Sequence, residues 1–147
     1  MACIFEDVLK RFHKVVIQVA RRHDGRQSLS VKDEYDVQDL LHALLKALFD
    51  DVRAEEVVPS YAGASARMDF LLKEEQIGVE IKMASAKLRD REVGEQLLID
   101  IGCYQAHQNC KTLICLVYDP GSHIRNAPGL RNDLSAYSGE NCHLFRK

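Results

Sequence analysis

The sequence predicts an α/β fold, a three-layer sandwich in which a mixed central β-sheet is flanked by helices. Three observations predict it. Two amphipathic helical segments come first, a set of strand-like segments follows, and a further helical segment then leads into a continuous apolar strand. This order is typical of a sheet that helices cover on both faces. A length of 147 residues suits one domain, and no linker or internal repeat divides residues 1–147.

The N-terminal part of the chain predicts two helices. Residues 3–22 carry apolar side chains at helical spacing with charged residues between them. Gly25 is a natural stop after this helix. A second helix is expected to start near Asp33 or Glu34 and to present an apolar face as far as Leu48. Acidic residues in its first turn suit the positive end of the helix dipole.

Strand patterns follow the second helix. Residues 51–60 predict a short strand and a proline-bounded loop, and the small residues 61–66 predict a flexible loop. Residues 67–72 and 77–83 alternate as strands do, and the polar stretch 73–76 joins them, so we expect an antiparallel hairpin. One parity of the first strand is apolar throughout: Met68, Phe70 and Leu72.

The C-terminal part returns to helix and then to strand. Residues 90–107 have helical spacing, and 112–118 form the continuous apolar strand expected inside a sheet that is covered on both faces. Residues 119–129 predict a loop, 130–137 a short helix and 142–145 an edge strand.

Composition excludes several classes of protein. Apolar residues make up 46% of the chain, and no apolar run approaches the ~20 residues that cross a bilayer, so we expect no membrane partner. Charged residues interrupt the N-terminus, which argues against a signal peptide. The five cysteines show no C-x-x-C spacing and fit free thiols in a cytoplasmic protein. Neither phosphate-binding glycine loops nor a G-x-S-x-G elbow occurs.

Three charged residues interrupt the apolar strands of the predicted hairpin. Glu80 and Lys82 are two residues apart, so they project from the same face of a strand, and antiparallel pairing brings Asp69 opposite them. Two close carboxylates repel each other unless a cation lies between them, and Mg²⁺ usually takes one or two carboxylates. A metal beside a lysine suits phosphodiester hydrolysis. A cross-strand ion pair without catalysis is the alternative.

The arrangement resembles the PD-(D/E)XK nuclease superfamily, in which an Asp on one strand precedes a (D/E)-x-K on the next. Asp69 and Glu80-Ile81-Lys82 match this motif, with a helix before and a helix after them. Arg67-Met68 stands where the superfamily usually has a proline, a departure that is common there. Closer still, the segments DEYDVQDLLHALL, VEIK and EQLLIDIGCYQAH look like a nuclease domain of the DpnII/MboI restriction endonuclease kind, found in bacterial defence proteins.

The resemblance covers about residues 33–134, and it implies a restriction-endonuclease-like core that cleaves DNA with Mg²⁺, or with Mn²⁺ as a substitute. It implies Asp69, Glu80 and the backbone carbonyl of Ile81 as metal ligands. Lys82 would orient the attacking water or stabilise charge, and its alternative role is a structural ion pair.

The flanking helices offer further candidates. Gln96 matches the family's glutamine on the helix after the motif and could contact water, phosphate or the lysine, or could be a solvated residue. Glu34 and Asp39 lie on the preceding helix, and either could bind a water of the metal shell; Glu34 is favoured. Tyr104 follows Gln96 by eight residues and could lie on the same helix face, but packing in the core is favoured.

Basic residues directly after the E-x-K strand are candidate phosphate contacts. They are Lys87, Arg89 and Arg91, and a solvated loop is their alternative role. Cleavage of both strands favours a homodimer or a larger defence complex, whereas a nickase needs one copy. Two rival functions stay open: a catalytically silent nucleic-acid-binding or structural module of the same fold, and a metal-dependent RNase.

Overall fold

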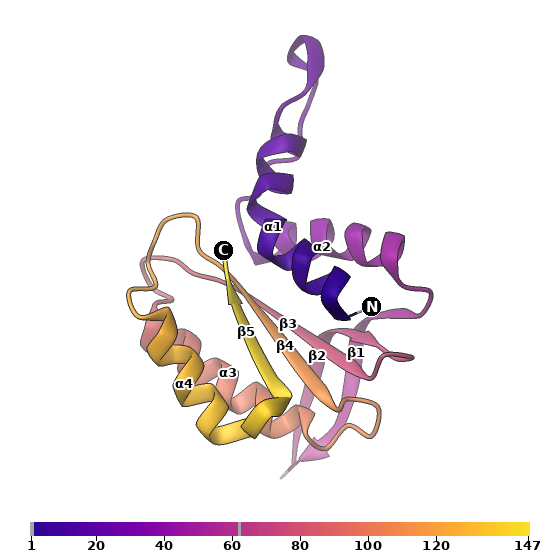
Figure 1. Cartoon of the computed structure of the whole chain (residues 1–147), viewed down its shortest axis with the longest axis vertical. Helices are drawn as coiled ribbons and strands as arrows, with labels where there is room; N and C mark the ends of the chain where they lie inside the picture. The colour runs from indigo at the N-terminus through magenta and orange to yellow at the C-terminus, as the bar shows by residue number, and fades with distance from the viewer. Residues whose placement is uncertain (1, 62) are drawn as a thin grey trace.

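The computed structural model describes residues 2–61 and 63–147. In chain order its elements are α1 (Ala2–Ala20), the 3₁₀ helix η1 (His23–Gly25), α2 (Glu34–Leu48), β1 (Val52–Tyr61), β2 (Ala64–Leu72), β3 (Ile77–Met83), α3 (Asp90–Tyr104), β4 (Thr112–Tyr118), α4 (Ala127–Ser138), the 3₁₀ helix η2 (Gly139–Asn141) and β5 (Cys142–Arg146). Apart from the two short 3₁₀ helices, this is the predicted order (Figure 1).

The five strands form one mixed sheet in the order β1-β2-β3-β4-β5. β1, β2 and β3 pair antiparallel, whereas β3, β4 and β5 pair parallel. Helices α3 and α4 make the crossovers that parallel neighbours require. The mixed sheet and the edge position of β5 confirm the predictions.

Helices cover both faces of the sheet, which confirms the three-layer sandwich (Figure 1). One apolar core joins α1 and α2 to one face, with Phe5, Leu41 and Ile81 fully buried in it. The other core joins α3 and α4 to the opposite face, with Val93 and Leu97 fully buried in it. Within the described part of the chain, no helix is long and apolar enough to span a membrane.

Local signals explain where several elements begin. Asp33 caps α2 by accepting a hydrogen bond from the Asp36 N–H, and the Asp36 carboxylate accepts one from the Asp33 N–H. This reciprocal cap satisfies two backbone donors at the helix start. α4 begins at Ala127, three residues earlier than predicted. The Asn126 side chain caps it and Pro128 lies in its first turn, where a missing N–H costs nothing.

The predicted loop over residues 61–66 is wrong in part. β1 extends to Tyr61, β2 begins at Ala64, and Val58 pairs with Ala66 in a long hairpin. Small residues have weak strand preferences of their own, and the pairing with β1 decides their conformation. Residue 62, within the same predicted loop, lies outside the described residues.

The predicted alternation along β2 also breaks. Phe70 packs in the core under α1 and α2, whereas Met68 packs in the core under α3 and α4, although the two residues share a parity. Asp69 lies between them, and Glu55 on the neighbouring strand β1 has a positive φ of 52°. The backbone is therefore irregular next to Asp69, and the side chains before and after it face opposite layers.

Candidate active site

Asp69 lies where β2 separates from β3. The β2–β3 ladder is paired at Phe70 and Val79, and beyond that pair the Asp69 carboxylate replaces the strand backbone as acceptor. Asp69 Oδ2 accepts a hydrogen bond from the Ile81 N–H at 2.8 Å. Its other oxygen, Oδ1, accepts one from Gln38 Nε2 at 2.9 Å, which ties the site to α2. Each oxygen of the carboxylate thus accepts one hydrogen bond, Oδ2 from β3 and Oδ1 from α2, and the two bonds fix its orientation.

Glu80 and Lys82 project together toward α3, as their spacing predicted. Lys82 Nζ lies 2.8 Å from Glu80 Oε1 and 3.2 Å from Asp100 Oδ2. In the first contact Lys82 donates a hydrogen bond to Glu80, and the two side chains form an ion pair when Glu80 is ionised. The second is an ion pair by distance, but its atoms are not aligned for a hydrogen bond, so buried Asp100 Oδ2 has no hydrogen-bond partner among the described residues. Lys82 and Glu80 are only 12% and 5% exposed, so water screens the pair weakly.

Tyr104 packs in the core, as expected, and also contacts the site. Its hydroxyl oxygen lies 2.7 Å from Glu80 Oε2 and 2.8 Å from the Arg67 carbonyl oxygen. One hydroxyl proton can be donated to only one of these acceptors. Both contacts become hydrogen bonds when Glu80 is protonated, because Glu80 then donates to Tyr104 and Tyr104 donates to the Arg67 carbonyl.

The electrostatics agree with a protonated Glu80. Burial, followed by the nearby charges of Asp69 and Asp100, raises the pKa of Glu80 to about 8. Burial also raises the pKa of Asp69 to about 6, although the hydrogen bond from Ile81 opposes the shift. Burial alone would lower the pKa of Lys82, but the contact with Glu80 and the charges of Asp100 and Glu34 together outweigh burial and hold this pKa above its usual range. The ammonium therefore stays charged.

The donor set fits a hard divalent cation. The charges of Glu34 and Asp100 contribute to the raised pKa of Asp69, and those of Asp69 and Asp100 to the raised pKa of Glu80, with Lys82 as the buried cation among these four carboxylates. A divalent cation would relieve this excess of negative charge. No group of three or more Asp, Glu, His or Cys side chains is placed to share a metal within residues 2–61 and 63–147. Two carboxylates completed by water suit Mg²⁺.

The two acidic candidates on α2 lie at different places. Glu34 Oε2 accepts a hydrogen bond from the Met83 N–H at 3.0 Å, so it lies at the end of the strand that carries Lys82. Asp39 is exposed and lines a cavity of about 200 Å³ together with Asp69 and Gln38.

Asp100, rather than Gln96, contacts Lys82 from α3. Gln96 is exposed and lies one helical turn before Asp100 on the same face. Sequence reasoning missed Asp100 and also Gln38, which contacts Asp69. A signal existed for both, because each lies four residues after a candidate that the sequence had singled out, Gln96 and Glu34 respectively.

The basic residues after β3 are exposed. Arg91 Nε pairs with Glu95 at 2.9 Å, and Arg89 Nε donates to the Ala86 carbonyl at 3.2 Å. The Lys87 side chain is exposed in a turn that Ser85 stabilises by accepting a bond from the Lys87 N–H.

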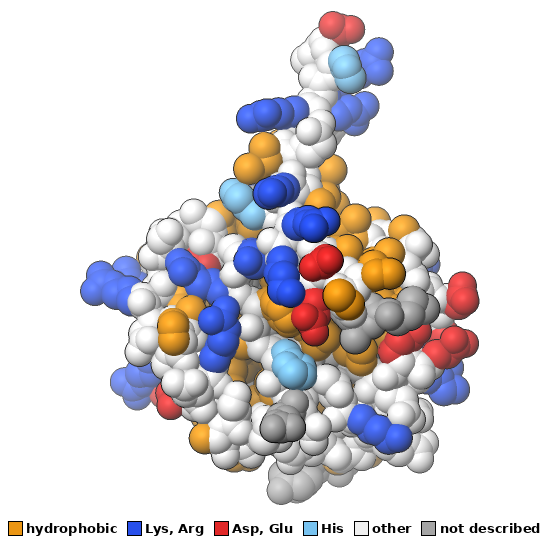
Figure 2. Space-filling view, in the orientation of Figure 1, with side chains coloured by type: hydrophobic (Ala, Val, Ile, Leu, Met, Phe, Trp, Pro, Cys, Tyr) orange, Lys and Arg blue, Asp and Glu red, His pale blue; other side chains and the backbone are white. Residues whose placement is uncertain are grey.

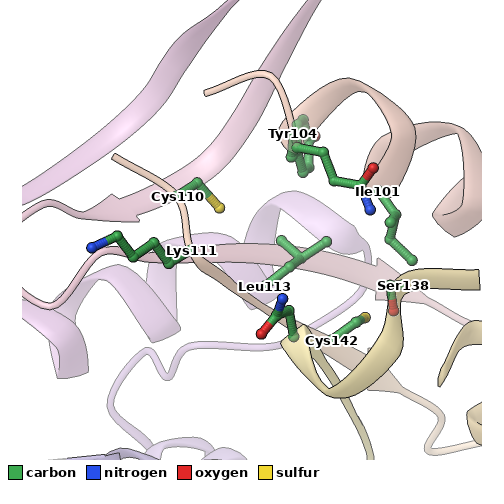
Figure 3. A pocket seen from close by; sticks show the side chains of 9 residues that line it. Ile101, Tyr104, Cys110, Lys111, Leu113, Ser138 and Cys142 are labelled. Atoms are coloured by element: carbon green, nitrogen blue, oxygen red, sulfur yellow. The ribbon is translucent and has the colours of Figure 1, made fainter. Parts of the chain in front are cut away.

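A second cavity, of about 230 Å³, lies between the end of α3, the start of β4 and the end of α4, and Tyr104 contributes to both this cavity and the site (Figure 3). Its lining residues are Ile101, Tyr104, Gln105, Cys110, Lys111, Leu113, Ser138, Asn141 and Cys142. None of these lining residues is a carboxylate or a histidine. The cluster of Asp69, Glu80 and Lys82 is therefore the candidate active site, and this cavity is not.

The chain matches one family model over most of its length. The model of the DpnII–MboI restriction endonucleases (REase_DpnII-MboI) matches residues 4–143. The chain belongs to this family. Its membership in the DpnII–MboI family indicates a DNA endonuclease, and the match includes α1, which lay outside the resemblance over residues 33–134. No curated protein and no solved structure matches the chain significantly.

Proposed function

We propose that the chain hydrolyses phosphodiester bonds of DNA with Mg²⁺, or with Mn²⁺ as a substitute, and serves in bacterial restriction or defence. The single observation that carries the proposal is the juxtaposition of Asp69 with the Glu80–Lys82 pair in a buried cluster that is short of positive charge. We assign Asp69, Glu80 and the Ile81 carbonyl to the metal. When bound, Mg²⁺ supplies an activated water and neutralises developing negative charge.

The protein residues divide the remaining tasks. Gln38 and the Ile81 N–H hold the Asp69 carboxylate in one orientation. Glu80 and Asp100 hold the Lys82 ammonium from two sides. Because its pKa is raised, Lys82 acts as a fixed cation that stabilises charge on the phosphate, and not as a general base.

Three further assignments complete the proposal. Glu34 supports the end of β3 and binds a water of the metal shell, and Gln96, one helical turn before Asp100 on α3, is available to a phosphate. The basic residues Lys87, Arg89 and Arg91 contact the DNA backbone. We place the activity in the cytoplasm, in keeping with five free cysteines, and in a homodimer or a larger defence complex when both strands are cut.

Supercoiled plasmid tests the proposal. The wild type should nick or linearise it in Mg²⁺ and not in EDTA. Lys82→Ala should abolish cleavage, whereas Lys73→Ala, which removes an exposed lysine from the hairpin turn, should cleave as the wild type does. Cleavage that survives in EDTA or in Lys82→Ala would contradict the assigned centre. Cleavage of RNA alone would indicate the RNase alternative, and Mg²⁺ binding without cleavage of any nucleic acid would indicate a silent module.

A further inference from the structure

A long stretch of the N-terminal region leaves the body of the protein. Between Phe12 and Val37 no residue is buried. The last turns of α1 and the connection to α2 project away from the other layers (Figure 1). We call residues 13–32 the arm. Val15, Val16, Val19 and Val31 pack, partly buried, against the core under α1 and α2, but residues 20–30 belong to neither core. Residues 20–30 therefore add little to folding stability, and their sequence is free to serve another purpose.

The arm concentrates positive charge. It contains Lys14, Arg21, Arg22, Arg26 and Lys32 but only one acidic residue, Asp24, which makes its formal charge +4. The whole chain carries −2, so the remaining residues carry −6. Lysine and arginine side chains follow the projecting segment (Figure 2). Within the described part of the chain, none of the arm's basic side chains forms an ion pair, which leaves their charge to a partner.

Both ends of the arm are attached beside the candidate active site. At its start, His13 Nδ1 lies 2.9 Å from the hydroxyl of Tyr118, the last residue of β4. At its end the chain enters α2, where Glu34 accepts the hydrogen bond from the Met83 N–H. Tyr118 and Met83 are register partners at the carboxyl ends of their strands, one residue beyond Lys82. The arm therefore rises from the edge of the sheet that carries the site.

The tip of the arm is shaped by a turn. Asp24 and Gly25 have positive φ angles, and the Arg26 N–H donates to the His23 carbonyl at 3.1 Å, so Arg22 and Arg26 flank the turn. Residues 21–32 run out and back, which limits their reach to about 20 Å. That reach is enough to meet several phosphates of a duplex that carries one charge per ~1.7 Å of axis.

Resting on the DNA-cleaving function above, we propose that the arm binds the phosphate backbone of duplex DNA held at the site. Phosphate is the chemistry that an unpaired cluster of arginine and lysine recognises, independently of base sequence. The arm exposes only two large apolar side chains, Ile17 and Leu29, each 39% exposed, which is little for a protein-binding surface. Its charge also places a basic surface beside a site that is otherwise acidic.

The test compares two triple variants that remove equal charge. The arm variant is Arg21→Ala/Arg22→Ala/Arg26→Ala. The control is Lys46→Ala/Lys73→Ala/Lys111→Ala, three exposed lysines near the opposite end of the sheet, where α2 ends and where β3 and β4 begin. Fluorescence anisotropy with a labelled duplex, in EDTA and over a range of salt concentrations, measures the dissociation constant. All six positions are exposed, so both variants should melt as the wild type does.

The arm variant should bind about tenfold or more weakly at low salt, and its salt slope should fall by about 2 to 3 because each lost phosphate contact removes about 0.9. The control should lose much less. Equal weakening in both variants would show a general charge effect and overturn the proposal. Unchanged binding in the arm variant would also overturn it, and a simultaneous loss of dimer in sedimentation would assign the arm to contact with a second copy.

Plasmid cleavage separates this proposal from the proposed function. If the chain is not a Mg²⁺-dependent nuclease, the wild type leaves plasmid intact, while the two variants still differ in duplex binding in EDTA. If only the arm proposal fails, the wild type cleaves plasmid and the variants bind duplex alike.

Discussion

Binding of Mg²⁺ at Asp69 and Glu80 is expected to release about one proton at pH 7. In the metal-free protein the pKa of Glu80, about 8, lies above this pH and the pKa of Asp69, about 6, lies below it, so the two carboxylates together hold about one proton. Both must be ionised to bind a cation. Because the pKa of Glu80 is the higher of the two, the released proton is assigned to Glu80, whose carboxyl group contacts the Tyr104 hydroxyl.

The same competition sets the pH dependence of affinity. Raising the pH removes the proton that competes with the metal, so the apparent affinity for Mg²⁺ should rise about tenfold per pH unit between pH 6 and pH 8. Above pH 8 Glu80 is already ionised and the affinity should level off. Below pH 6 the dependence should become steeper, because Asp69 is protonated as well.

Isothermal titration calorimetry in two buffers of equal pH and different ionisation enthalpy measures the released proton directly. Glu80→Gln is the control, because it keeps the size of the side chain but has no proton to release on binding. A heat that is the same in both buffers at pH 7, together with an affinity that stays constant from pH 6 to pH 8, would refute the reasoning.

Two further predictions concern the same cluster. In EDTA the free energy of unfolding of the wild type, relative to Glu80→Gln, should fall by about 1.4 kcal/mol per pH unit from about pH 4.5 to about pH 8, because the folded pKa of Glu80 is raised above its unfolded value. Denaturant titrations at several pH values measure this difference in the free energy of unfolding. A difference that rises with pH would contradict a raised pKa of Glu80 in the folded protein. Asp100→Asn should slow plasmid cleavage about ten- to hundredfold by loosening Lys82, and an unchanged rate would remove Asp100 from the site.

Elements with a strong local pattern were predictable. The apolar run 112–118 coincides with β4, and the polar stretch 73–76 is the turn that pairs Leu72 with Ile77. Glu80 and Lys82 share a face because strand side chains alternate strictly, whatever the strand packs against. The order of helices and strands followed from such patterns alone.

Features that depend on a distant partner were not predictable in the same way. The small residues before Asp69 became strand through pairing with β1. The irregularity that turns Met68 and Phe70 to opposite layers lies beside Glu55, on the neighbouring strand. The periodic pattern within one segment does not show which strand will pair with it, so effects of that pairing cannot be predicted from the segment alone.

The sequence by itself determined the three-layer order of elements and the spacing of Asp69, Glu80 and Lys82, because hydrophobic periodicity and strand alternation are local properties. Only the tertiary structure decided that Gln38 reaches Asp69 and that Asp100 reaches Lys82. A helix presents several residues to the sheet at intervals of one turn, and the docking of the whole helix selects the one that makes contact.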